Sequence, residues 1–396
     1  MVLGKIVFAG GDAKSFGKGE RHLRELAELD ITGRHVGRLT EKIGAELARK
    51  RDEEVALYRR RELPAVVEMV PAAVVVEVDG GRVQTRTPAQ GFGVHEPHWR
   101  EDKVGCLCSL HSVECAADPH PQVPRCYLDR AYVHTLVDEM HTMRGAVKSQ
   151  EKLTPNVCPP PSVDETGPPG KTPRWQPERL VRTVVATLED SEAFGPMVAA
   201  EAQRRNFFAS PRAAFVGDGQ AYNWTIHRTW FPDFTDIADF VHGTSYVYQA
   251  ARASVEPGAD SWPTYVRWIT AVWQGRVAEV LADLRLLVGP SEQAFQEPAR
   301  LAALQESLTY LENNESRMDY PRYRRLGLPI VSALVESLVK EINWRVKGTE
   351  KFWNDPDGAE AILQVRAALL SEDDRLANYL ANRAGKLYRR ERARAA

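Results

Sequence analysis

The chain has 396 residues, of which 43% are hydrophobic and 27% charged, and its formal net charge is −2 at pH 7. This length allows two or three domains, and the composition is typical of folded globular proteins rather than disordered ones. The net charge excludes a uniformly basic surface, although local basic patches stay possible. The one long apolar stretch, at 65–78, is interrupted by Glu68, Pro71 and Glu77, so we expect no membrane span and no membrane partner.

The start of the chain lacks the apolar core and cleavage site of a signal peptide, so we expect a cytoplasmic location. Five cysteines, an odd number, argue against a disulfide framework. A zinc site is conceivable in one Cys- and His-rich stretch, but the stretch has no C-x₂-C pairing, so we favour scattered buried or surface residues on a strand and a loop. The residues concerned are Cys106, Cys108, His111, Cys115, His120 and Cys126.

The first predicted elements are two short helices within residues 1–62. Leucine and other apolar residues recur at helical spacing on both sides of an interruption at 30–33, and Thr32 is suited to cap the second helix. Two helices joined by a tight turn indicate a helix-turn-helix-like, DNA-binding segment. An ordinary helical hairpin with a solvated charged face explains the same pattern. The residues expected to meet DNA on the second helix are Arg34, Arg38 and Lys42.

A strand-rich block follows. Residues 73–79 are β-branched, Gly80 and Gly81 are a hairpin-turn signal, and 82–86 alternate as the return strand. Further strands are predicted at 104–110, 181–188, 213–216 and 237–241, and helices at 129–143 and 191–206. The Pro-rich stretch 154–177 is predicted to be a linker or a long surface loop.

The second half of the chain reads as helical. A helical pattern covers 244–326, a long amphipathic helix is predicted at 330–346, a last helix at 358–370, and the end of the chain is basic. We therefore expect an α/β protein. Its predicted parts are the helical segment 1–62, the first part of a catalytic core at 63–243, an all-α insertion at 244–326, the last part of the core at 327–372 and a basic tail at 373–396.

Three acidic residues stand out by their surroundings. Asp79 and Asp218 each follow a hydrophobic strand and stand beside glycine, and a carboxylate at the end of a buried strand needs a partner such as a divalent cation. Glu336 begins a polar stripe on the predicted long helix that continues through Lys340, Asn343 and Lys347. Turn-forming Asp–Gly pairs and a solvated Glu–Lys helix face are the alternatives for these residues.

A strand Asp, a later strand Asp and a helix Glu follow one another in the chain order of the RNase H-like fold of DDE transposases and retroviral integrases. Over most of its length the chain resembles bacterial insertion-sequence transposases of the ISKra type. The motifs that carry the resemblance are Val78-Asp79-Gly80-Gly81-Arg82-Val83, the run from Phe215 to Trp224, Ala238-Asp239-Phe240-Val241-His242, Asn314-Glu315-Ser316-Arg317-Met318-Asp319-Tyr320, and the run from Gly327 to Ser337.

The resemblance implies an RNase H-like mixed sheet flanked by helices, with an all-α insertion before the last acid. It implies that Asp79, Asp218 and Glu336 form a catalytic triad that binds two Mg²⁺ ions, or Mn²⁺, and that Asp239 and His242 are an auxiliary D-x-x-H element. The implied reaction is two-metal phosphoryl transfer, in which element ends are cut and joined to target DNA. The implied partners are the terminal repeats, a target duplex and a second copy of the chain, in the bacterial cytoplasm at the nucleoid.

Phosphate contacts are expected from Lys340, Asn343 and Lys347, and from the basic tail. Val331 and Ala333 stand where glycines flank the serine in the family, and their presence could reduce activity. A catalytically degenerate relative that binds DNA and regulates transposition is therefore the alternative function, and a metal-dependent nuclease is a third. Because the helix-turn-helix-like segment begins so early, a segment upstream of it could be missing.

Overall fold

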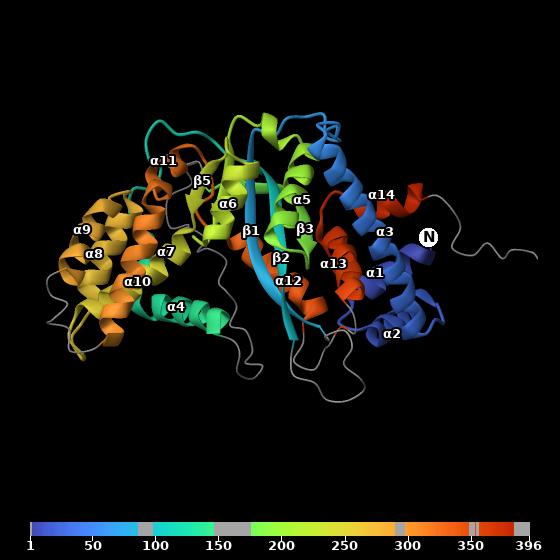
Figure 1. Cartoon of the computed structure of the whole chain (residues 1–396), viewed down its shortest axis with the longest axis horizontal. Coiled ribbons are helices and arrows are strands. Elements are labelled where there is room, and N and C mark those ends of the chain that lie inside the picture. The colour runs from blue at the N-terminus through green and yellow to red at the C-terminus, as the bar shows by residue number, and fades with distance from the viewer. Residues whose placement is uncertain are drawn as a thin grey trace, which may run out of the picture.

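The computed structural model describes residues 2–85, 98–145, 176–289, 298–347, 353 and 356–383. A five-stranded mixed sheet in the order β3-β2-β1-β4-β5 lies at the centre of the molecule (Figure 1). β1, β2 and β3 form an antiparallel meander, whereas β4 and β5 continue the sheet parallel to β1. The predicted mixed α/β class is confirmed. The strands are β1 (Ala73–Thr85), β2 (His98–His111), β3 (Glu178–Thr187), β4 (Ala213–Gly217) and β5 (Thr235–Ala238).

The hairpin predicted at Gly80 and Gly81 is wrong, because β1 runs straight through both glycines to Thr85. Both residues pair with β2, Gly80 with Lys103 and Gly81 with Asp102. The glycines make room for side chains of the neighbouring strand instead of turning the chain. A Cβ atom on Gly81 would lie 2.7 Å from one carboxylate oxygen of Asp102, which is closer than such atoms can approach.

The strands predicted at 104–110, 181–188 and 213–216 are confirmed as parts of β2, β3 and β4. The strand predicted at 237–241 ends early, since β5 stops at Ala238 and Asp239 caps a helix that begins at Phe240. The Asp239 side chain accepts the N–H groups at the start of this helix, which satisfies donors that would otherwise be unpaired.

Helices cover both faces of the sheet. On one face, α5 (Ser191–Arg204) packs Val198 and Phe194 over Gly105 of β2, and α6 (Ala221–Trp230) packs beside Gly217 of β4. α12 (Ala333–Val346) and α13 (Pro356–Leu370) cover the other face. The predicted helices at 191–206, 330–346 and 358–370 correspond to α5, α12 and α13.

A helical lobe lies beyond the β5 edge of the sheet, at the left of Figure 1. It contains the all-α stretch predicted at 244–326, and Trp268 and Trp273 are buried in it. Trp262 is partly buried and packs against this core. Its helices are α4 (Arg130–Gly145), α7 (Phe240–Ser254), α8 (Trp262–Trp273), α9 (Val277–Val288), α10 (Pro298–Asn314) and α11 (Tyr320–Arg325). Elsewhere along the chain and in the lobe, short 3₁₀ turns lie at Arg125–Leu128, Phe207–Ala209 and Glu315–Arg317.

The N-terminal segment has three helices rather than two, α1 (Val2–Asp12), α2 (Phe16–Ala27) and α3 (Gly33–Arg59). Thr32 caps α3 as predicted, by accepting the N–H of His35 at 3.4 Å. α3 is not short, because its second half packs on α13. At the contact, a Cβ on Gly44 would meet the backbone of Ala361, so only glycine allows this approach.

The C-terminal part also differs from the prediction. The basic tail predicted from residue 373 begins with a folded helix, α14 (Arg375–Asn382), which packs on α13. The last part of that tail, 384–396, lies outside the described residues, as does 154–175 of the predicted Pro-rich loop. Among the described helices, none is both long and apolar enough to cross a membrane.

Candidate active site

The strand register brings three aspartates to the same level of the sheet. Glu77 of β1 pairs with Val216 of β4, so two residues further along Asp79 is level with Asp218. Gly217 of β4 pairs with Ala238 of β5, so Asp218 is in turn level with Asp239. Neighbouring strands lie about 4.8 Å apart, and the carboxyl ends of parallel strands are where open α/β sheets bind ligands.

Asp79 lies in the middle of β1, where it pairs with Val104 of β2. Its Oδ1 accepts the N–H of Gly80 at 2.7 Å. Burial raises the pKa of Asp79 to about 6, and the charge of Asp218 adds to this effect, whereas His242 opposes it. Asp79 therefore lies within electrostatic reach of Asp218, whose charge disfavours the ionised form of Asp79.

Asp218 stands at the first position beyond β4, where the chain turns toward α6. The following turn holds its carboxylate: Oδ1 accepts the N–H of Gln220 at 3.0 Å and Nδ2 of Asn223 at 2.8 Å, while Oδ2 accepts Nε2 of Gln220 at 2.6 Å. Gly219 has φ +97°, which the tight turn requires. These contacts fix the direction of the carboxylate toward the end of the sheet.

Glu336 reaches the site from α12, and a residue that the sequence did not single out sets its position. Glu77 of β1 is fully buried, and its Oε2 accepts the N–H of Val335 at 2.8 Å. This bond joins the first turn of α12 to the strand that carries Asp79. Burial raises the pKa of Glu336 to about 7, with further contributions from Asp239 and Asp79 that His242 and Lys340 oppose.

Asp239, His242 and Ser332 form a buried network beside these acids. Oδ2 of Asp239 accepts the N–H of Ser332 at 3.0 Å and also its hydroxyl, and it lies 3.4 Å from Nδ1 of His242. Burial lowers the pKa of His242, but the Asp239 carboxylate outweighs that effect and raises the pKa to about 9. His242 is therefore an imidazolium at neutral pH.

The predicted triad differs from the group of acidic and histidine side chains whose ligand atoms lie within 4.8 Å of one another. Among the described residues, the one group of three or more His, Cys, Asp or Glu side chains with all ligand atoms within 4.8 Å is Asp239, His242 and Glu336. Asp79 and Asp218 are not members of it. This cluster could hold a metal ion. Its members also contact one another and their surroundings, because Asp239 accepts hydrogen bonds from Ser332 and lies 3.4 Å from Nδ1 of His242.

Val331 and Ala333, which stand where glycines were expected, flank Ser332 at the start of α12. Between them, Ser332 donates its N–H and hydroxyl to Asp239, and its hydroxyl lies 3.3 Å from Oε1 of Glu336. Ala333 is exposed in the first turn of α12, and Val331 is half-buried. The two side chains are thus compatible with a helix start that holds Glu336 beside Asp239.

The predicted DNA-binding residues lie in two places. Lys340 and Lys347 are exposed on α12, and Asn343 between them is half-buried, with its Oδ1 buried and unpaired. The three basic residues of α3 are exposed at one-turn spacing along its first half, on a surface remote in sequence from the acids. These residues are Arg34, Arg38 and Lys42.

The motif Asn314–Tyr320 packs against α6 and β5, the elements next to Asp218 and Asp239. Oδ1 of Asn314 accepts Nε1 of Trp224 at 3.0 Å, and Arg317 donates to Asp236 at 2.7 Å while lying over the Trp224 ring. The hydroxyl of Tyr320 donates to the carbonyl of Ala238 at 3.0 Å. The motif therefore holds β5, which ends next to Asp239, and α6, which follows Asp218 in the chain.

The cysteine-rich stretch forms no metal cluster among the residues that the structure describes. Cys106 and Cys108 are buried on β2 with their sulfur atoms 3.7 Å apart, and Cys115 and Cys126 are partly exposed elsewhere. Packing explains the two strand cysteines.

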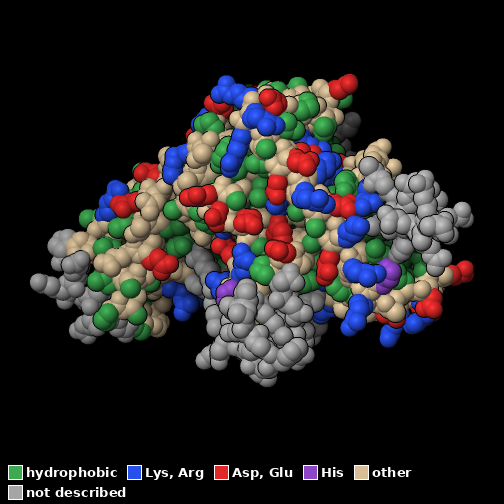
Figure 2. Space-filling view, turned by 45° about the vertical axis from the view of Figure 1, so that its right-hand side comes forward, with side chains coloured by type: hydrophobic (Ala, Val, Ile, Leu, Met, Phe, Trp, Pro, Cys, Tyr) green, Lys and Arg blue, Asp and Glu red, His purple; other side chains and the backbone are tan. Residues whose placement is uncertain are grey.

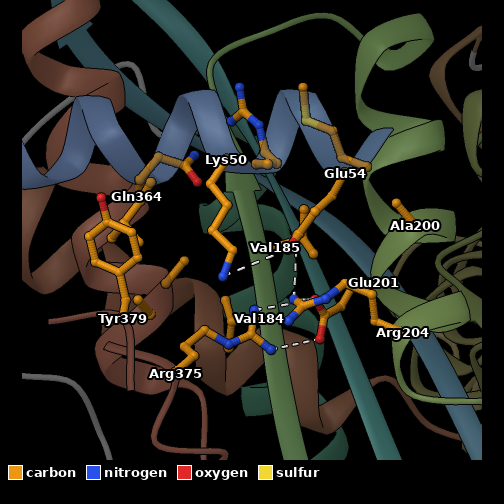
Figure 3. A pocket seen from close by; sticks show the side chains of 15 residues that line it. Lys50, Glu54, Val184, Val185, Ala200, Glu201, Arg204, Gln364, Arg375 and Tyr379 are labelled. Carbon is orange, nitrogen blue, oxygen red and sulfur yellow. Dashed lines mark hydrogen bonds and ion pairs between the residues drawn. The ribbon is translucent and has the colours of Figure 1, made fainter. Parts of the chain in front are cut away.

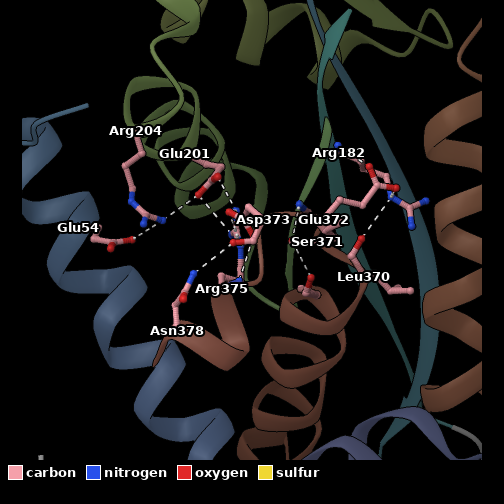
Figure 4. A network of polar contacts seen from close by, with 12 residues as sticks. Glu54, Arg182, Glu201, Arg204, Leu370, Ser371, Glu372, Asp373, Arg375 and Asn378 are labelled. Carbon is pink, nitrogen blue, oxygen red and sulfur yellow. Dashed lines mark hydrogen bonds and ion pairs between the residues drawn. The ribbon is translucent and has the colours of Figure 1, made fainter. Parts of the chain in front are cut away.

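A pocket lies at the other edge of the sheet, between α3, α5, α13, α14 and β3 (Figure 3). Its charged side chains neutralise one another: Arg375 pairs with Glu201 at 2.6 Å, and Arg204 pairs with Glu201 at 3.1 Å and with Glu54 at 3.4 Å. Figure 4 shows the same network continuing to Asp373. The pocket is stabilised from within by these pairs, which join α14 and α3 to α5.

Comparison with models of known protein families gave no match, and neither did a search of curated proteins.

Proposed function

We propose that the protein is a DDE-type transposase whose core is an RNase H-like fold. The meander of β1, β2 and β3, with β4 and β5 added parallel on the other side of β1, supports this fold. The observation that carries the proposal is the register that sets Asp79 and Asp218 side by side, with Glu336 brought to the same face by the bond between Glu77 and Val335.

The donor set fits divalent cations that prefer oxygen ligands. Asp79 and Glu336 are partly buried acids with raised pKa values beside other acids, and a cation between them would relieve this repulsion. We propose that Asp79, Asp218 and Glu336 hold Mg²⁺ or Mn²⁺. Such ions, when bound, supply activation of the attacking oxygen and neutralise charge on the leaving oxygen.

The remaining residues act on the substrate and on one another. The imidazolium of His242, held in its charged form by Asp239, offers a positive charge to the scissile phosphate. Asp239 and Ser332 orient both His242 and Glu336. Lys340 lies one turn beyond Glu336 on α12 and extends the positive charge toward the DNA backbone.

The charge distribution suits this substrate despite the net charge of −2. Figure 2 shows acidic side chains gathered near the centre of one face, with Lys and Arg side chains beside them. DNA affinity depends on local phosphate contacts rather than on total charge. We propose contacts from Lys340 and Lys347 near the site, and from Arg34, Arg38 and Lys42 on α3, where the second helix of a helix-turn-helix meets DNA.

Cleavage of DNA that carries the element ends tests the proposal. Wild-type protein with Mg²⁺ should nick the end and join the freed 3′-hydroxyl to a second labelled duplex, whereas Asp218→Asn should do neither. The matched control is Asp233→Asn, an exposed acid close in sequence, which should retain both steps. Binding of ends without any nicking would favour the regulatory relative, and nicking without joining would favour a nuclease.

A further inference from the structure

A fourth carboxylate lies beside the proposed triad, on β2. The side chain of Asp102 is 0% exposed, and no other residue in the described part of the chain donates a hydrogen bond to either of its carboxylate oxygens, so that its own backbone N–H is the one donor nearby. Asp102 pairs with Gly81, which is two residues beyond Asp79 on β1. Side chains of paired residues lie on the same face of a sheet, and alternate residues share that face, so Asp102 and Asp79 are on one side.

Gly81 creates the space that Asp102 fills. A Cβ atom on Gly81 would lie 2.7 Å and 2.8 Å from the two oxygens of Asp102, so the carboxylate lies over the backbone of β1 next to Asp79. Glycine at this position offers no side chain to serve as a donor. Packing against Gly81 thus places the carboxylate beside the site, and no side chain of β1 neutralises its charge.

α12 covers this face and offers few donors. Its polar stripe passes from Glu336 through Asn343 to Lys347 at the end of the helix. The charge of Lys347 acts on Asp102 and lowers its pKa, in opposition to burial. No ion pair joins Lys347 to Asp102 among the described residues, and the Lys347 ammonium lies 6.0 Å from the ring centre of Trp99. Asn343, one turn before Lys347, has a buried Oδ1 that also lacks a partner. Among the described residues, three buried acceptor oxygens here thus have no hydrogen-bond partner on another residue: both oxygens of Asp102 and Oδ1 of Asn343.

A buried carboxylate without a partner is unfavourable in either protonation state. An ionised group loses its hydration, and a protonated one still leaves an oxygen and a hydroxyl without partners. A cation removes this imbalance, because it is bound by several oxygens at once. Carboxylate and amide oxygens are the ligands that Mg²⁺ and Mn²⁺ prefer over softer metals.

We propose that Asp102 and Asp79 together bind a divalent cation of the Mg²⁺ and Mn²⁺ class, with Oδ1 of Asn343 as a further oxygen ligand from α12. Asp102 is then a fourth acid of the site, on a strand that carries none of the predicted triad. The inference extends the metal site of the proposed function, but it concerns cation binding by the free protein and does not depend on DNA cleavage.

Titration of the metal-free full chain with Mn²⁺, followed by the electron paramagnetic resonance of free Mn²⁺, tests the proposal. We expect Asp102→Asn to weaken one Mn²⁺ site at least tenfold. The matched control is Glu101→Gln, because Glu101 precedes Asp102 but is 53% exposed and pairs with Lys103. That variant should bind Mn²⁺ like the wild type. Equal Mn²⁺ affinity of Asp102→Asn and the wild type would overturn the inference.

Two further readouts separate cation binding from a structural role. Asp102→Asn should raise the melting temperature of the metal-free protein, because it removes an unpaired buried charge, and it should reduce the rise that Mn²⁺ causes. Asn343→Asp adds a carboxylate and should tighten Mn²⁺ binding. A lower metal-free melting temperature for Asp102→Asn together with weaker Mn²⁺ binding by Asn343→Asp would contradict the proposal and indicate hydrogen bonding between the two side chains.

The outcomes also distinguish this inference from the proposed function. Should Asp102→Asn fail to fold, as judged by circular dichroism, Asn343→Asp alone decides the matter. Unchanged Mn²⁺ binding by Asp102→Asn, combined with DNA cleavage that Asp218→Asn abolishes, would overturn the fourth ligand and leave the transposase proposal intact. Loss of one Mn²⁺ site in Asp102→Asn, combined with no DNA cleavage by the wild type, would support the fourth ligand and contradict the transposase proposal.

Discussion

At the scale of single residues, the site depends on two buried acids whose pKa values are shifted in opposite directions. Glu77 is fully buried, and burial raises its pKa well above the ordinary value, while its Oε2 accepts the N–H of Val335. Asp239 is equally buried, but His242 and Ser332 lower its pKa and keep it ionised. Two carboxylates that are equally buried thus have pKa values shifted in opposite directions, and the difference is set by their hydrogen-bond partners.

Glu77→Gln keeps the acceptor for Val335 and the volume of the side chain, so we expect a change in the free energy of unfolding within about 1 kcal/mol. Glu77→Ala leaves a cavity and an unpaired N–H at the start of α12, and should cost about 3 kcal/mol. Urea denaturation measures both values. Equal losses for the two variants would show that the charge of Glu77, rather than its shape and acceptor, matters.

Asp239→Asn should lower the pKa of His242, because the carboxylate that holds the imidazolium is removed while the burial that opposes it stays. The remaining partners also lose a charged acceptor, so we expect a stability loss of about 3–5 kcal/mol. NMR titration of the His242 ring checks the pKa. His227, which bonds the carbonyl of Phe234, serves as an internal reference. An unchanged pKa of His242 would show that other groups hold the charge.

At the scale of elements, the central feature is a continuous β1 with glycines in its middle. Gly81→Ala should destabilise the protein by about 2–3 kcal/mol, because the new Cβ meets the fully buried carboxylate of Asp102. Gly80→Ala is the matched control. Its Cβ would meet Oε1 of Glu101, the end of an exposed side chain that can move, so the cost should stay below about 1 kcal/mol. Thermal unfolding of the pair measures the difference, and equal costs would contradict this packing.

The comparison of sequence and structure is most instructive at these glycines. A Gly-Gly pair after an apolar run has the same local pattern whether it turns the chain or makes room for a neighbour, and only the pairing with β2 decides. For the same reason, the sequence did not reveal the importance of Asp102 and Glu77. Their importance depends on register with segments far away in the chain, which local periodicity does not contain.

Other elements could be predicted because their signals are local. Thr32 caps α3, the alternation and β-branching of β2, β3 and β4 mark strands, and the apolar stripe of α12 marks a helix. The length of α3 could not be predicted, since its second half is stabilised by contact with α13, more than 300 residues later. The level alignment of Asp79 with Asp218 likewise became visible only through strand pairing.

At the scale of the whole molecule, the raised pKa values predict how stability depends on pH. Asp79 and Glu336 bind protons more tightly in the folded protein, with pKa values of about 6 and about 7 against ordinary values of 3.8 and 4.5. Their stabilising contribution is complete below the ordinary values and is lost as the pH rises through the folded ones. The metal-free protein should therefore lose stability between about pH 4 and pH 7 from these groups.

Mg²⁺ should reverse this loss, because it binds the ionised carboxylates of the folded state. We expect the rise in melting temperature caused by Mg²⁺ to grow from pH 5 to pH 8, as measured by scanning fluorimetry with and without a chelator. His242 does not account for this trend. Its pKa is raised to about 9, so its contribution is lost only at higher pH. A Mg²⁺ effect that is independent of pH would contradict binding by Asp79 and Glu336.

The most direct test of the account is anomalous diffraction from crystals of the full chain grown with Mn²⁺. We expect anomalous density between the carboxylates of Asp79, in the middle of β1, and Asp218, just beyond the end of β4. Density only at other places, or none in crystals where Mn²⁺ is bound elsewhere on the chain, would contradict the claim that strand register builds a metal-dependent site from these acids.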